Sequence, residues 1–135
     1  MHIRRATLSD AAAVRTIIEQ VYVGGGWADP DTSPEYVHSL LAAEERIVGA
    51  TVLLAVIDGE PVGTVTATEG APYANIAVPG ELAVRMLGVL PEVRRNGVAR
   101  ALMAACEDLA RQRGRHRVVL STEPEMTAAQ ALYEV

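Results

Sequence analysis

The chain has 135 residues, a formal net charge of −5 and an isoelectric point of about 5.1. This length suits a single domain over residues 1–135, and a composition that is 50% apolar and 21% charged excludes a disordered chain. The acidic balance argues against a nucleic-acid partner, and the lack of any run of about 18 apolar residues argues against a membrane span.

The first forty residues predict a strand followed by two helices. Residues 3–6 are expected to form a short strand, after which Thr7 and Asp10 have the spacing of a capping box. The next helix has one apolar face, because its apolar residues recur at i, i+3, i+4 and i+7: Val14, Ile17, Ile18 and Val21. Three glycines at 24–26 end it, and Ser33-Pro34-Glu35 has the residues that begin a second helix.

The rest of the chain predicts a sheet with further helices. The expected strands are 51–57, 62–68, 82–90 and 117–120, and the expected helices are 97–113 and 127–134. Asp58-Gly59 is typical of a hairpin turn, and a strand, a long helix and a strand over 82–120 predict a parallel crossover. The order predicts an α/β fold, with a mixed, mostly antiparallel central sheet and helices on both faces.

The segment with the most chemical information lies between the strand that ends near Val89 and the helix that begins near Gly97. Backbone N–H groups in the first turn of a helix have no intrahelical partners and lie at the positive end of the helix dipole, so they bind phosphate. Small residues there let a pyrophosphate approach, and Arg94, Arg95 and Arg100 add positive charge. The spacing alone fits an ordinary turn with surface arginines equally well, and it is neither a P-loop nor a dinucleotide-binding motif.

This segment resembles motif A of the GCN5-related N-acetyltransferase (GNAT) superfamily, in the pattern Val89-x-Pro91-Glu92-x-Arg94-x-x-Gly97-Val98-Ala99. Residues 118–122, together with Ala129 and Leu132-Tyr133-Glu134, resemble motif B. The segments 3–10 and 58–63 resemble the usual start and central hairpin of the family. The resemblance covers the whole chain and implies a GNAT-like acyl-CoA N-acyltransferase fold.

The resemblance also implies a reaction and a cofactor site. The reaction is direct transfer of the acetyl group of acetyl-CoA, as co-substrate, to an amine of a small molecule or a protein. The pantetheine arm would pair with the backbone of the strand that ends at Val89, and a backbone N–H near Leu87 would stabilise the oxyanion. The residues implied around the cofactor are Leu87, Gly88, Val89, Arg94, Arg95, Asn96, Gly97, Val98, Ala99 and Arg100.

Two side chains are candidates for proton transfer. An amine with a pKa near ~10 is mostly protonated at neutral pH and needs a base, for which Glu81 is the candidate. A solvated carboxylate is the alternative for Glu81, with water as the base or an acceptor that arrives neutral. The departing thiolate needs an acid, and Tyr133 matches the tyrosine of the family by position. A tyrosine that only packs the last helix onto the sheet would give the same pattern.

Several positions depart from the family pattern. Arg95 stands where many members have glycine, Met126 where many have asparagine, and Ala83 where members often have an acid. Members also continue with two further strands, so the domain is expected to be truncated at its C-terminus. The strand at 117–122 would then present an open edge, through which we expect a homodimer. The alternatives to an active enzyme are a non-catalytic acyl-CoA-binding module and an incomplete domain completed by another chain.

The cysteine and the histidines predict neither a nucleophile nor a metal site. Cys106 is the only cysteine, which excludes an intrachain disulfide and fits a cytoplasmic protein. It lies on the apolar face of the helix at 97–113, so we expect a core residue and not a nucleophile. His2, His38 and His116 are scattered without the spacing of metal ligands, so no metal site is expected.

Overall fold

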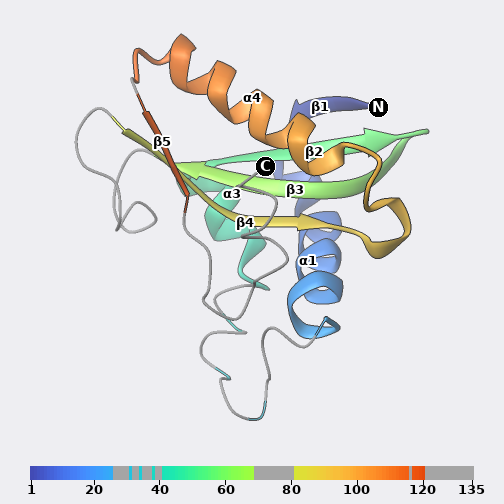
Figure 1. Cartoon of the computed structure of the whole chain (residues 1–135). Helices are drawn as coiled ribbons and strands as arrows, with labels where there is room; N and C mark the ends of the chain where they lie inside the picture. Colours follow the sequence, from blue (N-terminus) through green and yellow to red (C-terminus); the bar gives the residue numbers. More distant parts are fainter. Residues whose placement is uncertain are drawn as a thin grey trace.

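The computed structural model describes residues 1–25, 31, 34, 38, 41–68, 81–115 and 117–120. Within these residues a five-stranded sheet has the order β1-β2-β3-β4-β5 (Figure 1). Its strands are β1 (His2–Arg5), β2 (Thr51–Ile57), β3 (Glu60–Thr68), β4 (Glu81–Val89) and β5 (Arg117–Leu120). The first four pair antiparallel in sequence order, and β5 pairs with β4 in parallel. The predicted mixed, mostly antiparallel sheet is confirmed.

Helices cover both faces of this sheet, as predicted. The helices are α1 (Ala11–Ile18), α3 (Ala43–Gly49) and α4 (Val98–Gln112). Helices α1 and α3 lie on one face and α4 lies on the other (Figure 1). Alternate residues of β2 separate accordingly, since Val52 and Leu54 join the core under α1 and α3, whereas Leu53 and Ala55 join the core under α4.

The predicted boundaries agree with the structure to within one or two residues, apart from the region of the second helix. Strand β2 and strand β5 match their predictions, β3 begins two residues earlier, and β4 is shifted by one. The turn at Asp58 and Gly59 has φ angles of 51° and 79°, which a two-residue hairpin loop of this hand requires. Most of the helix expected from Ser33 lies outside the described residues, as does the one at 127–134, and α3 was not predicted separately.

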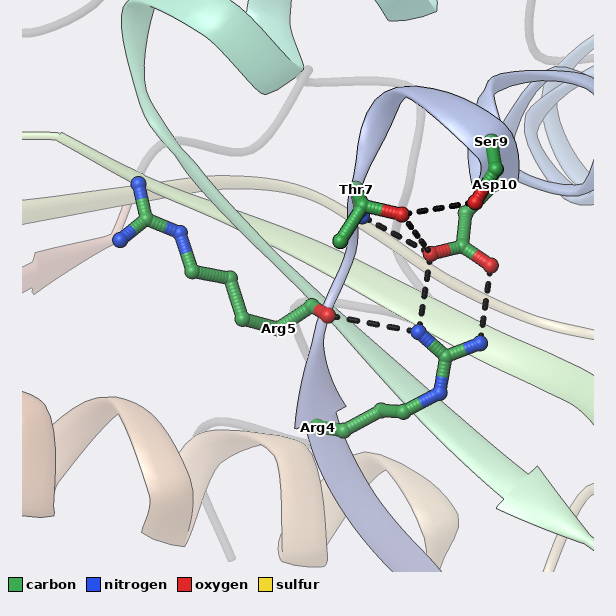
Figure 2. A network of polar contacts seen from close by, with 5 residues as sticks. All are labelled: Arg4, Arg5, Thr7, Ser9 and Asp10. Carbon is green, nitrogen blue, oxygen red and sulfur yellow. Dashed lines mark hydrogen bonds and ion pairs between the residues drawn. The ribbon is translucent and has the colours of Figure 1, made fainter.

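The connection from β1 to α1 is held by a polar network (Figure 2). The backbone N–H of Thr7 donates to Asp10 Oδ2 at 2.8 Å, and the Arg4 guanidinium donates to both Asp10 carboxylate oxygens at 2.8 Å. The predicted capping role of Asp10 is therefore confirmed, and a short 3-10 turn (Leu8–Asp10) leads into α1. The hydrogen bond from Arg4, and next that from Thr7, hold the pKa of Asp10 well below its usual range.

We expect Asp10→Asn to lower the free energy of unfolding by about 1–2 kcal/mol at pH 7, the usual value of a helix-capping contact. Because the folded-state pKa is depressed, this contribution is present above the unfolded-state pKa of about 3.9 and is lost as the pH falls toward the folded-state value. Denaturant unfolding at pH 7 and pH 3 should therefore show a smaller difference between variant and wild type at pH 3.

The matched control for this prediction is Asp108→Asn. The Asp108 carboxylate forms an ion pair with Arg111 at 2.7 Å, but its side chain is 67% exposed, so its loss should change stability by less than about 0.5 kcal/mol. A deficit of Asp10→Asn that is the same at both pH values would contradict the assigned cause.

The described part of the molecule has two further features that bear on the predictions. No helix within it is long and apolar enough to cross a membrane. Strand β5 lies at one edge of the described sheet, with β4 as its neighbour. The homodimer expected through this edge stays a prediction, which size-exclusion chromatography tests.

Candidate active site

Strand β4 has a described parallel partner only along its first half. Its first four residues, Glu81–Val84, pair with β5 in parallel register. No described strand pairs with residues 85–89 on that side. The Leu87 and Val89 carbonyls accept hydrogen bonds from Tyr22 and Arg94, and the other backbone groups of this segment are the ones that could pair with a ligand. This is the edge that the sequence predicted for the pantetheine arm.

A β-bulge lies at the point where this free edge begins. Thr66 of β3 lies opposite Arg85, and Thr64 of β3 lies opposite Gly88. The two threonines are two residues apart in β3, whereas Arg85 and Gly88 are three residues apart in β4. Strand β4 therefore carries one extra residue, and Met86 has a φ of 54° in the left-handed region. A bulge bends the strand and leaves one residue without a partner in the hydrogen-bond ladder, so the neighbouring backbone N–H and C=O groups point in new directions.

The bulge is held from the α1 side by Tyr22. The buried Tyr22 hydroxyl donates to the carbonyl oxygen of Leu87 at 3.3 Å. Tyr22 lies in a π-helical turn (Glu19–Val23) that continues α1, closed by a hydrogen bond from the Gly24 N–H to the Glu19 carbonyl at 2.9 Å. The wider turn places both Val21 and Tyr22 in the core. Sequence analysis missed Tyr22, because a 3.6-residue period marks Val21 and gives no signal for a π turn.

The turn after β4 exposes its backbone, as predicted. A 3-10 turn (Pro91–Val93) follows the strand, and Arg94 Nε donates to the Val89 carbonyl at 3.3 Å, which ties the turn to the strand end. Arg95 and Gly97 have φ angles of 71° and 78°. Gly97 is the N-cap of α4, and a Cβ placed on it would meet no atom within 4 Å. A side chain at position 97 would therefore point into open space.

The predicted cofactor residues divide into two groups by exposure. Leu87 and Val89 are 6% and 8% exposed and share a core cluster with Val98, so they can offer a cofactor only their backbone. The exposed residues are Arg94, Arg95, Asn96, Gly97 and Arg100. Gly63 fixes the start of α4 against the sheet, since a Cβ there would lie 2.9 Å from Val98 Cγ1. The structure thus brings the strand edge and the basic turn into one continuous site.

The two predicted proton-transfer residues do not join this group. Glu81 lies at the start of β4, is 7% exposed, and forms an ion pair with Arg117 at 3.3 Å. Six residues separate it from Leu87, which is about 20 Å along a strand. Its role as a base stays a prediction that this distance does not favour. Tyr133 lies outside the described residues.

The other reactive residues lie away from the site. Cys106 is fully buried under α4, and burial raises the pKa of its thiol to about 12, so it is a core residue as predicted. His38 lines a shallow surface hollow beside Arg15 and Glu44, which form an ion pair. Within the described ranges, no group of three or more His, Cys, Asp or Glu residues could hold a metal ion.

A mixed sheet with a bulge in β4, followed by a basic helix N-terminus, fits the class of acyl-CoA-dependent transferases. The model of the acetyltransferase (GNAT) family matches residues 13–135. The chain belongs to this family, as the resemblance of its motifs predicted, and it is an acetyl-CoA-dependent N-acetyltransferase.

Similar proteins agree with this assignment. The chain is 29% identical over 136 residues to the uncharacterized N-acetyltransferase YhfO of Bacillus subtilis (strain 168), covering 99% of this chain and 87% of that protein. It resembles the aminoglycoside N-acetyltransferase AAC(6′)-Iy in complex with CoA, with a TM-score of 0.73, 24% identity, and 98% and 84% of the two chains covered. For the ribosomal-protein-alanine N-acetyltransferase of Brucella melitensis biovar Abortus 2308, the TM-score is 0.74, with 24% identity and 99% and 89% coverage. At these identities the two structures show the fold.

Proposed function

We propose that this site transfers the acetyl group of acetyl-CoA directly to an amine of a small molecule or a protein. The observation that carries the proposal is the bulged strand β4, whose residues 85–89 have no described strand on one side and which runs into the exposed N-terminus of α4. The free edge at 85–89 offers a ladder of hydrogen bonds to the amides of the pantetheine arm. The amides from Arg95 to Arg100, apart from that of Asn96, which donates to the Val93 carbonyl at 3.3 Å, are proposed to offer the donors and the positive dipole that a pyrophosphate needs.

The bulge supplies the electrostatic part of catalysis in this proposal. Attack of a neutral amine on the thioester carbon places negative charge on the carbonyl oxygen. The backbone N–H of Leu87 is proposed to donate to that oxygen, because pre-oriented donors stabilise charge that develops in the transition state. Tyr22 bonds the Leu87 carbonyl, which fixes the next peptide group along the strand and so limits reorientation of the Leu87 N–H during the reaction.

Proton transfer completes the proposed mechanism. As the C–S bond breaks, Tyr133 is proposed to protonate the departing thiolate, and the amine proton is proposed to leave to water, because Glu81 lies about 20 Å along the strand from Leu87. Among the described residues that alternate on the same face of β4 as Glu81, Ala83 has no polar group and Arg85 is a cation. This shortage of a nearby base favours one alternative function, a non-catalytic acyl-CoA-binding module.

Calorimetric titration with acetyl-CoA, followed by a screen of amines for thiol release, tests the proposal. We expect micromolar binding and release of one thiol per amine acetylated. Binding without turnover on any amine would support the binding module instead. Well-folded protein that binds no acetyl-CoA would overturn both functions.

We expect Tyr22→Phe to lower kcat about 3- to 10-fold while the KM for acetyl-CoA and the Kd for CoA stay unchanged. The reason is that the loss of one hydrogen bond, worth about 1 kcal/mol, loosens the peptide group beside the oxyanion and not the groups that hold the cofactor. Steady-state kinetics with calorimetry on the same preparations measures this split.

The control is Ile47→Val, which removes one methylene from the α3 side of the core at a similar cost in stability, about 1 kcal/mol. It should leave kcat unchanged. If the two variants lose the same activity, Tyr22 acts only through stability.

A further inference from the structure

Arg85 is a cation in the middle of the sheet, on the face covered by α1. Strand residues alternate between faces, and Leu82 and Val84 belong to the core cluster under α4. The opposite face holds Arg85, whose cross-strand partner is Thr66. Thr66 in turn lies opposite Val52, a member of the cluster under α1.

The guanidinium of Arg85 has no counter-charge in the described part of the molecule. Its Nε is buried and has no hydrogen-bond partner, and no described residue forms an ion pair with it. A buried donor without an acceptor is costly, more so when it is charged. An arginine in this state therefore has an unsatisfied preference for an anion, which guanidinium groups bind with two parallel hydrogen bonds.

Arg85 lies beside the reacting position and not beside the phosphate turn. It immediately precedes the bulge residue Met86 and lies two residues from Leu87, about 7 Å along the strand. Four residues, about 13 Å, separate it from Val89, where the turn toward α4 begins. The phosphates of CoA at that turn are too distant to be its partner.

The two faces of β4 differ in what they can accept at the bulge. On the α4 face, Leu87 and Val89 pack with Val98 in an apolar cluster. On the α1 face, Met86 also belongs to an apolar cluster, but this face additionally carries the cation Arg85, with the buried hydroxyl of Thr66 opposite it. A polar acceptor is therefore received on the α1 face, next to Arg85.

We propose that Arg85 binds an anionic group, a carboxylate or a phosphate, that the acceptor carries close to its reacting amine. The substrate class is then a small amino acid or an aminoalkyl phosphate, and not a protein amino group without a neighbouring anion. This inference rests on the proposed acetyl transfer at the Leu87 bulge. It gives Arg85, which lies outside the family motifs quoted above, a role in binding the acceptor.

The test compares paired acceptors that differ only in the anion. The pairs are glycine with glycinamide, alanine with alaninamide, and phosphoethanolamine with ethanolamine, measured by thiol release from acetyl-CoA. We expect a kcat/KM about 10- to 100-fold higher for the anionic member of at least one pair, as for a charge-assisted bidentate contact. The pair that shows the preference tells carboxylate from phosphate.

Arg85→Met should remove this preference by raising the KM for the anionic acceptor, and Arg85→Lys should retain part of it. Arg5→Met is the matched control, because Arg5 is an exposed arginine on β1 at the opposite edge of the sheet; it should keep the full preference. The Kd for CoA, measured by calorimetry, should be the same in all four proteins.

A binding measurement keeps the proposal testable if Arg85→Met does not fold. Wild-type protein saturated with CoA is titrated with N-acetylglycine and with N-acetylglycinamide, and only the anionic product should bind. No preference in wild type, or a preference that survives Arg85→Met, overturns the role of Arg85 while leaving acetyl transfer intact. Failure of wild type to bind CoA overturns the proposed function itself.

Discussion

Gly97→Glu is expected to abolish binding of acetyl-CoA. Gly97 is the N-cap of α4 with a φ of 78°, and a Cβ on it would point into open space beside the exposed amides of the turn. A glutamate there occupies the position proposed for the pyrophosphate and repels it by like charge. We expect the Kd to rise more than about 100-fold, equivalent to the loss of about 3 kcal/mol of binding free energy.

The control for this variant is Gly114→Glu, at the other end of α4. Gly114 also has a positive φ, 68°, and also has open space around a Cβ, so the substitution introduces similar backbone strain and the same charge away from the turn. It should bind acetyl-CoA like wild type. Gly97→Ala adds strain of about 1–2 kcal/mol without charge, and it should bind with an intermediate Kd. If Gly97→Glu and Gly114→Glu have the same Kd for acetyl-CoA, the turn before α4 does not bind the pyrophosphate.

Tyr133→Phe is expected to lower kcat about 100-fold or more. Under the proposed mechanism, Tyr133 protonates the thiolate as the C–S bond breaks, and a positioned general acid contributes about 10²–10⁴ to a rate. Because the hydroxyl acts on the leaving group and not on the bound cofactor, the Kd for CoA should change less than about threefold.

Steady-state kinetics and CoA titration on the same preparation separate the two roles of Tyr133. A packing role predicts a lower melting temperature with weaker CoA binding and a nearly normal kcat. A catalytic role predicts the opposite pattern. Tyr22→Phe also removes one hydroxyl but acts on the reaction indirectly, so its decrease in kcat is the value against which the decrease for Tyr133→Phe is compared. A kcat within about threefold of wild type would assign the acid to another group.

Much of the fold could be predicted because its signals are local. The strand at 51–57 is a run of apolar and β-branched residues, and the turn after it needs Asp58 and Gly59 at positive φ, so neighbouring residues suffice to specify the hairpin. The capping contact of Asp10 is equally local, since Thr7 lies three residues away. The basic turn before Gly97, which is proposed to bind phosphate, was predicted for the same reason, from a short pattern of proline, arginine and glycine.

The parts of the site that could not be predicted depend on contacts between distant segments. Tyr22 and Leu87 are 65 residues apart in the chain, and their hydrogen bond exists only because a π turn rotates Tyr22 toward β4. The bulge at Met86 shifts the register by one residue, which hydrophobic alternation does not reveal. Glu81 looked like a candidate base in sequence, but the strand holds it about 20 Å from Leu87.

The sequence by itself determined the order of strands and helices, the hairpin and the basic turn, because each follows from periodicity, turn chemistry or a short motif. Only the tertiary structure decided how these pieces meet. It places a bulge in β4 after Arg85, bonds the Leu87 carbonyl to Tyr22, and leaves Arg85 without a described counter-charge beside the bulge. Register, burial and long-range pairing produce these features, and none of them is a property of neighbouring residues alone.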